Sequence, residues 1–188
     1  SRLRFILFLV FISASVVTHG QKKVKLKHAK VGKAGRLPNG DRYQRALGDV
    51  VFTQNTTTIY CDSAHIFKKQ NSLTAYGRVR ITDGDSVTIT SRRLEYDGDR
   101  RLAKLRNNVV FTKLATATLY TDFLDYARPV NVAYYYNGGK LVDSTNVLTS
   151  SKGYYNVNNN LASFKKDVKV VNPDYTMYSD SLQYNSRS

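Results

Sequence analysis

Residues 87–112, VTITSRRLEYDGDRRLAKLRNNVVFT, decide how this chain folds. The stretch contains two segments in which apolar and polar side chains alternate, and a short turn, DGD at 97–99, joins them. Alternation with a period of two indicates half-buried β-strands, and Asp and Gly supply the backbone angles of a tight turn. The stretch therefore predicts a β-hairpin, and related stretches recur along the chain.

The first recurring phrase returns every 29–30 residues. An aromatic residue closes each copy, at Phe67, Tyr96, Tyr126, Tyr155 and Tyr184, and an apolar residue opens it, at Ile59, Ile89, Leu119, Leu148 and Met177. A second phrase keeps the same period, with its third positions at Val50, Val79, Val109, Gly139 and Val168. Fixed periods of 20–50 residues mark repeat architectures. We therefore predict five stacked two-stranded copies, the last one truncated.

The predicted fold class is all-β, a β-jellyroll or solenoid of these repeats. In the second phrase the apolar or small residues alternate, as in Ala103, Leu105, Asn107, Val109 and Phe111. In the first phrase Leu119 and Tyr126 are seven apart, so they cannot share a face of one flat strand. A bulge or bend between them would place both inside. The copies would then form two facing sheets around an open-ended apolar groove, which could hold acyl chains.

The predicted groove residues come from the central copies, where the alternation is cleanest. The inward set is Val79, Ile81, Leu94, Tyr96, Leu105, Val109, Phe111, Leu124 and Tyr126. Copy four departs from the pattern, because Gly139 and Gly153 stand where a valine and a leucine are expected. We expect a weaker core there, or an opening of the groove. The chain lacks an initial Met and stops within copy five, so we expect a fragment whose last strand is covered in the full-length protein.

The N-terminal residues predict export. Arg2 and Arg4 precede the apolar run FILFLVFI at 5–12, which is too short for a comfortable membrane span and fits a secretory signal peptide over 1–20. Residues 1–46 hold 11 Lys or Arg against one acid, Asp41, and we expect 21–46 to be a basic flexible linker. Such a tail could attract anionic lipid or nucleic acid. Deleting it should leave a domain at 47–188 folded.

The sequence contains few residues that could catalyse a reaction or bind a metal ion. A single Cys and three His give no zinc pattern and no nucleophile–base pair, so we predict a protein that is not an enzyme and binds no metal or cofactor. Asp62, Asp122 and Asp180 recur near the expected bends, but Arg92 and Ser151 occupy the same place in other copies. Bend capping is therefore favoured over Ca²⁺ binding. A carbohydrate lyase of the parallel β-helix type is the enzyme alternative, and the short chain disfavours it.

The repeat region resembles the OstA/LptA family. The similarity rests on an L-x-Y phrase, a turn and an A-x-x-x-G/N-x-V-x-[FI] strand, seen best at 87–112 and again at 118–126 and 176–184. It covers about residues 47–184. It implies a periplasmic β-jellyroll, associated with the outer membrane, that binds the lipid A moiety of lipopolysaccharide in the groove. Other lipopolysaccharide-transport proteins would be its partners, and nucleic acid would not.

Two further expectations concern function and assembly. The alternative function is an exported structural or adhesin-like β-solenoid, with a packed core and no lipid ligand. Stacked repeats also expose unpaired strands at both ends. We therefore predict head-to-tail association through the end that contains GDVVF, at 48–52, and through the C-terminal end.

Overall fold

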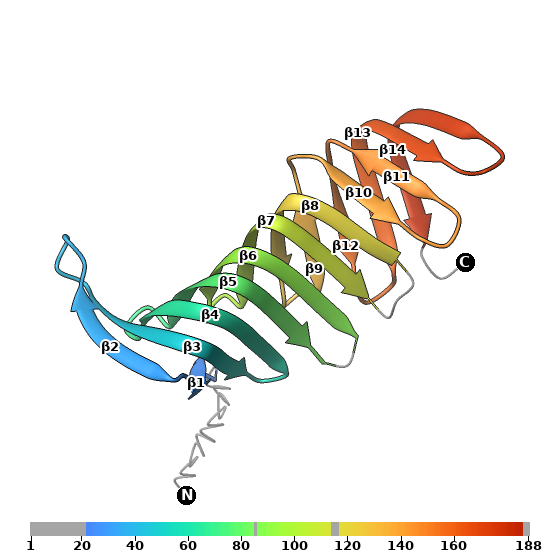
Figure 1. Ribbon diagram of the computed structural model, residues 1–188. Helices are drawn as coiled ribbons and strands as arrows, with labels where there is room; N and C mark the ends of the chain where they lie inside the picture. Colours follow the sequence, from blue (N-terminus) through green and yellow to red (C-terminus); the bar gives the residue numbers. More distant parts are fainter. Residues whose placement is uncertain (1–21, 85, 114–116, 186–188) are drawn as a thin grey trace, which may run out of the picture.

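The computed structural model describes residues 22–84, 86–113 and 117–185, so the predicted signal peptide lies outside the described residues. Within them the chain forms a single antiparallel sheet of 14 strands, stacked along one long axis (Figure 1). The strands are β1 (Lys25–His28), β2 (Val31–Arg36), β3 (Arg42–Gln54), β4 (Thr57–Phe67), β5 (Ser72–Asp83), β6 (Val87–Asp97), β7 (Leu102–Lys113), β8 (Ala117–Ala127), β9 (Val132–Tyr135), β10 (Gly139–Val142), β11 (Val147–Ser150), β12 (Lys152–Asn156), β13 (Leu161–Val171) and β14 (Thr176–Asn185). The predicted all-β repeat fold is confirmed. None of the described segments is a helix long and apolar enough to cross a membrane.

The long strands bend near their middle, so the sheet folds back on itself. We call the half that contains Phe52, Ile81 and Phe111 the first half-sheet. The half that contains Leu94, Leu105 and Leu124 is the second half-sheet. All six side chains are buried in one apolar cluster, so the core lies between the two half-sheets. This is the arrangement of two facing sheets that the sequence predicts.

The bend of β3, β5, β7 and β13 is a bulge that the sequence pattern concealed. In β7, Arg106 pairs with Phe123 and Val109 with Thr121, so β7 carries one residue more than β8 between these pairs. Asn107 and Asn108 fill the bulge with φ values of 66° and 52°. Asn residues adopt this left-handed conformation more easily than most others. The expectation that Asn107 continues the inward alternation was wrong, because its side chain is exposed at the bend.

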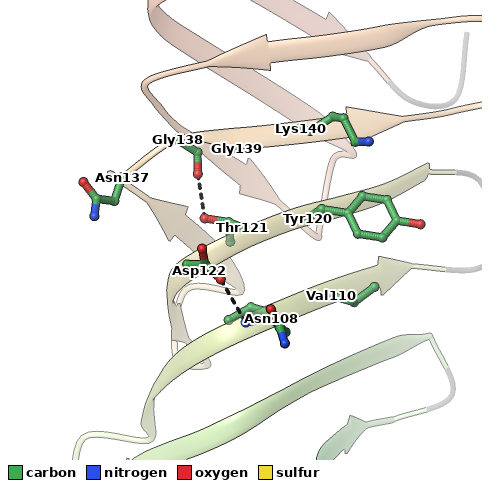
Figure 2. A pocket seen from close by; sticks show the side chains of 10 residues that line it. Asn108, Val110, Tyr120, Thr121, Asp122, Asn137, Gly138, Gly139 and Lys140 are labelled. Carbon is green, nitrogen blue, oxygen red and sulfur yellow. Dashed lines mark hydrogen bonds between the residues drawn. The ribbon is translucent and has the colours of Figure 1, made fainter.

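Copy four is split because its strands break at the bend. The segment 136–138 separates β9 from β10, and Gly138 has a φ of 83°. A hollow of about 420 Å³ lies on the outer side of this break, between β7, β8 and β10 (Figure 2). Inside, the ring of Tyr135 fills the space at both glycines, since a Cβ on Gly139 or Gly153 would lie within 2.7 Å of a Tyr135 side-chain atom. The expected weak core or opening at copy four is therefore replaced by a buried tyrosine.

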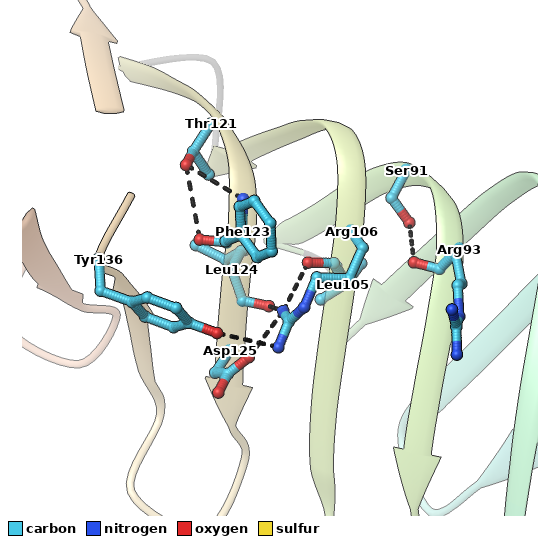
Figure 3. Close-up of polar contacts among 9 residues, drawn as sticks. All are labelled: Ser91, Arg93, Leu105, Arg106, Thr121, Phe123, Leu124, Asp125 and Tyr136. Atoms are coloured by element: carbon cyan, nitrogen blue, oxygen red, sulfur yellow. Dashed lines mark hydrogen bonds and ion pairs between the residues drawn. The ribbon is translucent and has the colours of Figure 1, made fainter. Parts of the chain in front are cut away.

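The strands β4, β6 and β8 bend by a second device, at the place the sequence predicted. In β6 the buried side is occupied by Ile89 and Ser91 before the bend and by Leu94 after it, so the inward phase shifts by one residue. The Ser91 hydroxyl donates a hydrogen bond of 3.0 Å to the carbonyl of Arg93, two residues on (Figure 3). Equivalent hydroxyl-to-carbonyl contacts form in later copies, at Thr121, Ser150 and Ser179.

Two of the recurring carboxylates cap bends, as expected. Asp62 pairs with Arg78 in the bulge of the next strand, with 2.6 Å between the charged atoms. The carboxylate of Asp122 accepts a hydrogen bond of 2.9 Å from the backbone N–H of Asn108. Among the described residues, no group of three or more His, Cys, Asp or Glu side chains is placed to hold a metal ion.

The N-terminal basic segment corrects the expected domain boundary. Residues 21–46 were expected to be a flexible linker, but they contain β1, β2 and the beginning of β3. β2 pairs with 42–47 of β3 and β1 pairs with 51–53, so the end of β3 that contains GDVVF, at 48–52, is partly occupied rather than free. Deleting 21–46 would uncover Phe52, because Leu26 pairs opposite it. The expectation that the rest would fold unchanged does not fit this pairing.

Candidate functional site: the interior between the half-sheets

The candidate site is the apolar interior, and the nine side chains predicted to point inward all lie in it. They come from four consecutive strands, β5 to β8, and none is more than 4% exposed. All nine belong to the same cluster of buried residues. Their inward orientation follows from the bulge in one kind of strand and the phase shift in the other. Both keep the apolar side chains on the inner face on each side of the bend. Binding of lipid by these residues remains a prediction.

The interior is longer than the predicted set. The same cluster continues on both sides of β5 to β8, through Val50, Phe52, Ile59, Ala64, Leu148, Phe164, Val168 and Val170. These residues occupy the equivalent positions of the outer copies, so the repeat period alone could have found them. The result is one continuous apolar interior along the stack.

A line of polar contacts closes this interior on the side opposite the bends. We call it the seam, and it joins the turn ends of the two half-sheets. The Tyr96 hydroxyl donates to the side-chain oxygen of Gln54 at 2.6 Å, and the Gln54 amide donates to the Gly98 carbonyl at 2.8 Å. The Tyr126 hydroxyl donates to Asp83 at 3.1 Å. Each contact links residues about one and a half repeats apart, so the hydrogen bonds of the seam connect successive copies to one another.

The later seam contacts repeat this scheme with other side chains. The buried ammonium group of Lys113 donates to the side-chain oxygen of Asn160 at 2.5 Å and also to the carbonyl of Val157. The Tyr184 hydroxyl donates to Asp143. Gln54, Asp83 and Lys113 end β3, β5 and β7, and Asp143 directly follows β10, so the four residues recur about 30 residues apart. Sequence reasoning missed this ladder because its residue types differ from copy to copy.

Asp83 is the most enclosed charge of the seam. Its side chain is 3% exposed and forms an ion pair with Arg128. It also accepts hydrogen bonds from the hydroxyls of Thr56 at 2.9 Å and Thr57 at 3.1 Å. A buried carboxylate is tolerated only when such partners replace water. Burial also raises the pKa of the seam tyrosines, that of Tyr96 to about 12, so they stay protonated donors at neutral pH.

The interior opens at the N-terminal end of the stack, in a region that we call the mouth. A cavity of about 860 Å³ lies between the β2–β3 hairpin and the turn after β4. A second cavity, of about 400 Å³, shares Gln44, Ile66 and Lys68 with the first and reaches the core residue Phe52. The inward positions of β2 carry small side chains. Gly32 pairs opposite Ala46 and Ala34 opposite Gln44, where the central copies carry leucines and tyrosines.

The C-terminal end of the interior is also uncovered in the described chain. Met177 is 38% exposed, whereas the four residues that open the earlier copies are at most 2% exposed. Leu182 and Tyr184 of β14 are only partly buried against the cluster. The interior therefore has exposed apolar surface at each end and polar contacts along its side.

The two side chains most relevant to catalysis are used structurally. Cys61 lies in the core cluster, and burial, together with the neighbouring Asp62, raises the pKa of its thiol to about 12. A thiol with so high a pKa is a poor nucleophile at neutral pH. His65 packs between the rings of Tyr43 and Tyr76, with ring centroids 4.9 and 5.7 Å away.

The family model described as OstA-like protein matches residues 21–180, which is most of the chain. The chain belongs to this family. No curated protein matches it. Among solved structures the chain is similar to LptH from Pseudomonas aeruginosa, which is described as the LptA-homologous periplasmic component of the lipopolysaccharide transport device. The two chains are 15% identical, the TM-score is 0.31, and the match covers 69% of this chain and 76% of LptH. Family membership rests on the family model and the fold on the strands themselves, not on this likeness. The predicted resemblance is confirmed, and the match begins at residue 21 rather than 47.

Proposed function

We propose that this protein is a non-enzymatic carrier of lipopolysaccharide in the periplasm. The acyl chains of lipid A would lie between the two half-sheets, against the nine inward side chains. The observation that carries the proposal is the continuous apolar interior that opens at the mouth of an OstA-like chain. Its partners would be other lipopolysaccharide-transport proteins at the outer membrane and further copies of this chain.

The energetics of opening are compatible with this role. Burial of one methylene group contributes about 0.8 kcal/mol, so an acyl chain of about ten methylenes would gain roughly 8 kcal/mol. A neutral seam contact contributes about 1 kcal/mol net. Separating two or three such contacts to admit a chain therefore costs less than the chain gains. The hydrogen bonds of the seam can therefore keep the protein closed without lipid and separate when an acyl chain enters.

A second candidate function is a structural β-solenoid with a permanently filled core. The observation that favours it is the dense interior, in which Leu94, Leu105 and Leu124 are 0% exposed. The closed seam points the same way. The two candidate functions predict different effects of a charged side chain placed in the interior. In a carrier it removes lipid binding, whereas in a structural solenoid it only lowers the stability of the fold.

Two neighbouring residues of β7 provide a matched test. Val109 points inward and is 1% exposed, whereas Val110 is half-buried and pairs on the outer face with Tyr120. The experiment is titration of the protein with fluorescent lipopolysaccharide, with circular dichroism as the control for folding. Val109→Arg should abolish binding because an unpaired charge would lie among the acyl chains. Val110→Arg should bind like the wild type.

The alternatives predict other outcomes. A wild-type protein that binds no lipopolysaccharide and carries none when purified from a bacterium that makes it would overturn the carrier proposal and favour the structural solenoid. If Val109→Arg does not fold, Leu105→Ala replaces it. In a permanently filled core this change costs roughly 2–5 kcal/mol of unfolding free energy. In a carrier it should also lower lipid affinity.

A further inference from the structure

The mouth carries an excess of positive charge. Arg36, Arg42, Lys68 and Lys69 all line its 860 Å³ cavity, and Asp41 is the one acid in that lining. Within residues 22–84, 86–113 and 117–185, no acidic side chain forms an ion pair with any of these four cations. Along the stack, by contrast, the guanidinium groups of Arg78, Arg106 and Arg128 are each paired with an aspartate.

Two of the mouth cations lie at the tip of the β2–β3 hairpin, and a third follows β4. Arg36 pairs opposite Arg42 at the tip of the β2–β3 hairpin, and Lys68 begins the turn after β4. Residues that pair directly across two strands lie on one face of the sheet. Alternation from the buried Ala46 places Arg42, and therefore Arg36, on the inward face. Their charges thus border the space between the half-sheets.

Apolar side chains lie immediately below these charges. The adjoining 400 Å³ cavity is lined by Val24, Leu26, Phe52, Ile66 and Phe67, with Lys23 and Lys68 beside them. Leu26 is 46% exposed although it pairs opposite the fully buried Phe52. A cationic rim over an apolar floor is complementary to an anionic headgroup that carries acyl chains. The volumes fall in the range usual for small-molecule sites, about 300–1,000 Å³.

We propose that the mouth binds the phosphorylated headgroup of the lipid, with Arg36, Arg42, Lys68 and Lys69 around the phosphates and the first acyl methylenes against Leu26 and Ile66. This inference rests on the proposed carrier function and specifies which part of the cargo is recognised and where. Arg offers a planar pair of donors to phosphate oxygens, and Lys adds a mobile point charge. The acyl chains would continue from the mouth into the interior.

The test compares diphosphoryl lipid A with dephosphorylated lipid A that has the same acyl chains. The full chain is titrated with each lipid at low and at high salt. Wild-type protein should bind the phosphorylated form more tightly, and added salt should reduce the difference because it screens exposed charges. Removal of one such cation typically costs about fivefold in affinity, so Lys68→Gln with Lys69→Gln should weaken binding of the phosphorylated form about 30-fold. Binding of the dephosphorylated form should not change.

The control variant removes two charges far from the mouth. Lys152 and Lys165 are exposed and pair across β12 and β13, and Lys152→Gln with Lys165→Gln should leave both affinities at the wild-type value. Inorganic phosphate should compete no better than chloride at the same ionic strength, because it cannot fill the apolar floor. Effective competition by phosphate would overturn the lipid assignment.

The outcomes separate the two proposals. Equal binding of both lipids by the wild type, or an unchanged preference in the Lys68/Lys69 variant, would refute the headgroup site and leave the carrier function standing. Absence of binding to either lipid would refute both. If the Lys68/Lys69 variant and the Lys152/Lys165 variant lost the same affinity for phosphorylated lipid A, the loss would be an effect of net charge, and the headgroup site would also be refuted.

Discussion

Single residues hold the two half-sheets at a fixed distance. At the bends, a hydroxyl group bonds to the carbonyl two residues on, and Ser91, Thr121, Ser150 and Ser179 repeat this contact. At the seam, Tyr96 reaches across to Gln54. The Arg106 guanidinium secures the outer face, where it donates to the carboxylate of Asp125 and to the hydroxyl of Tyr136 (Figure 3). Bends and seam together explain why the interior is closed along its length.

The seam contact of Tyr96 gives the first prediction. Tyr96→Phe removes the donor and leaves the buried Gln54 oxygen without it, so the free energy of unfolding should fall by about 1–3 kcal/mol. Chemical denaturation measures the change. Tyr120→Phe is the matched control, since Tyr120 is 43% exposed on the outer face and should lose less than about 0.5 kcal/mol. Equal effects of the two variants would show that the seam contributes no stability.

At the residue scale, sequence reasoning recovered the apolar positions better than the polar ones. Leu94 and Leu105 could be placed inside because alternation reports burial directly. The ladder that contains Gln54 and Asp83 could not, because its members share a place in the fold but not a side-chain chemistry. The position of the hydroxyl group at the bend could be seen in the sequence as a Ser or Thr that recurs in four copies, with Cys61 at the same position of the first copy. Its role requires knowledge of the bend.

At the scale of elements, the two kinds of strand reach the same bent shape in different ways. The strands β4, β6 and β8 shift the phase of their buried residues, which the seven-residue spacing of Leu119 and Tyr126 revealed. The strands β3, β5, β7 and β13 insert an extra residue, which keeps the alternation of apolar and polar residues in the sequence intact and so hides the bulge. The strand β1 was missed for another reason. Val24 and Leu26 alternate with lysines at the period of a strand, but the charge of the segment suggested a linker.

The bulge of β7 gives the second prediction. Asn107 has a φ of 66°, a conformation that a β-branched residue adopts only with strain. Asn107→Val should therefore lower the free energy of unfolding by about 1–3 kcal/mol. Asn107→Gly should be nearly neutral, because glycine adopts this conformation without steric cost. Thermal and chemical unfolding of the two variants provide the comparison, and a Val variant as stable as the Gly variant would contradict the assigned backbone conformation.

At the scale of the whole molecule, the stack is an apolar interior with two distinct ends. The mouth combines small inward residues with free cations, and the far end shows Met177 beside a strand, β14, that pairs only with β13 among the described residues. β1 and β2 likewise pair only with β3 in the part of the chain that the structure describes. Such free edges accept strands from other chains.

The free edges give the third prediction, which places the head-to-tail contact between β14 of one copy and the β1–β2 edge of the next. Light scattering after size exclusion should show chains that lengthen with concentration. Met177→Lys should shift the equilibrium towards monomer, because the contact would bury the new charge. Gln183→Lys places the same charge on the outer face of β14 and should have little effect. A wild-type protein that stays monomeric at high concentration would exclude this contact.

NMR can locate acyl chains between the half-sheets through contacts with inward methyl groups. The protein is deuterated except for its Ile, Leu and Val methyl groups and is mixed with unlabelled lipopolysaccharide, and isotope-filtered NOEs to the acyl methylenes are recorded. If the acyl chains lie there, NOEs are expected from Ile81, Leu105 and Val109, which point inward, and none from Val110 or the exposed Val130. NOEs confined to Val110 and Val130, or absent from every methyl group at saturating lipid, would contradict this position of the acyl chains.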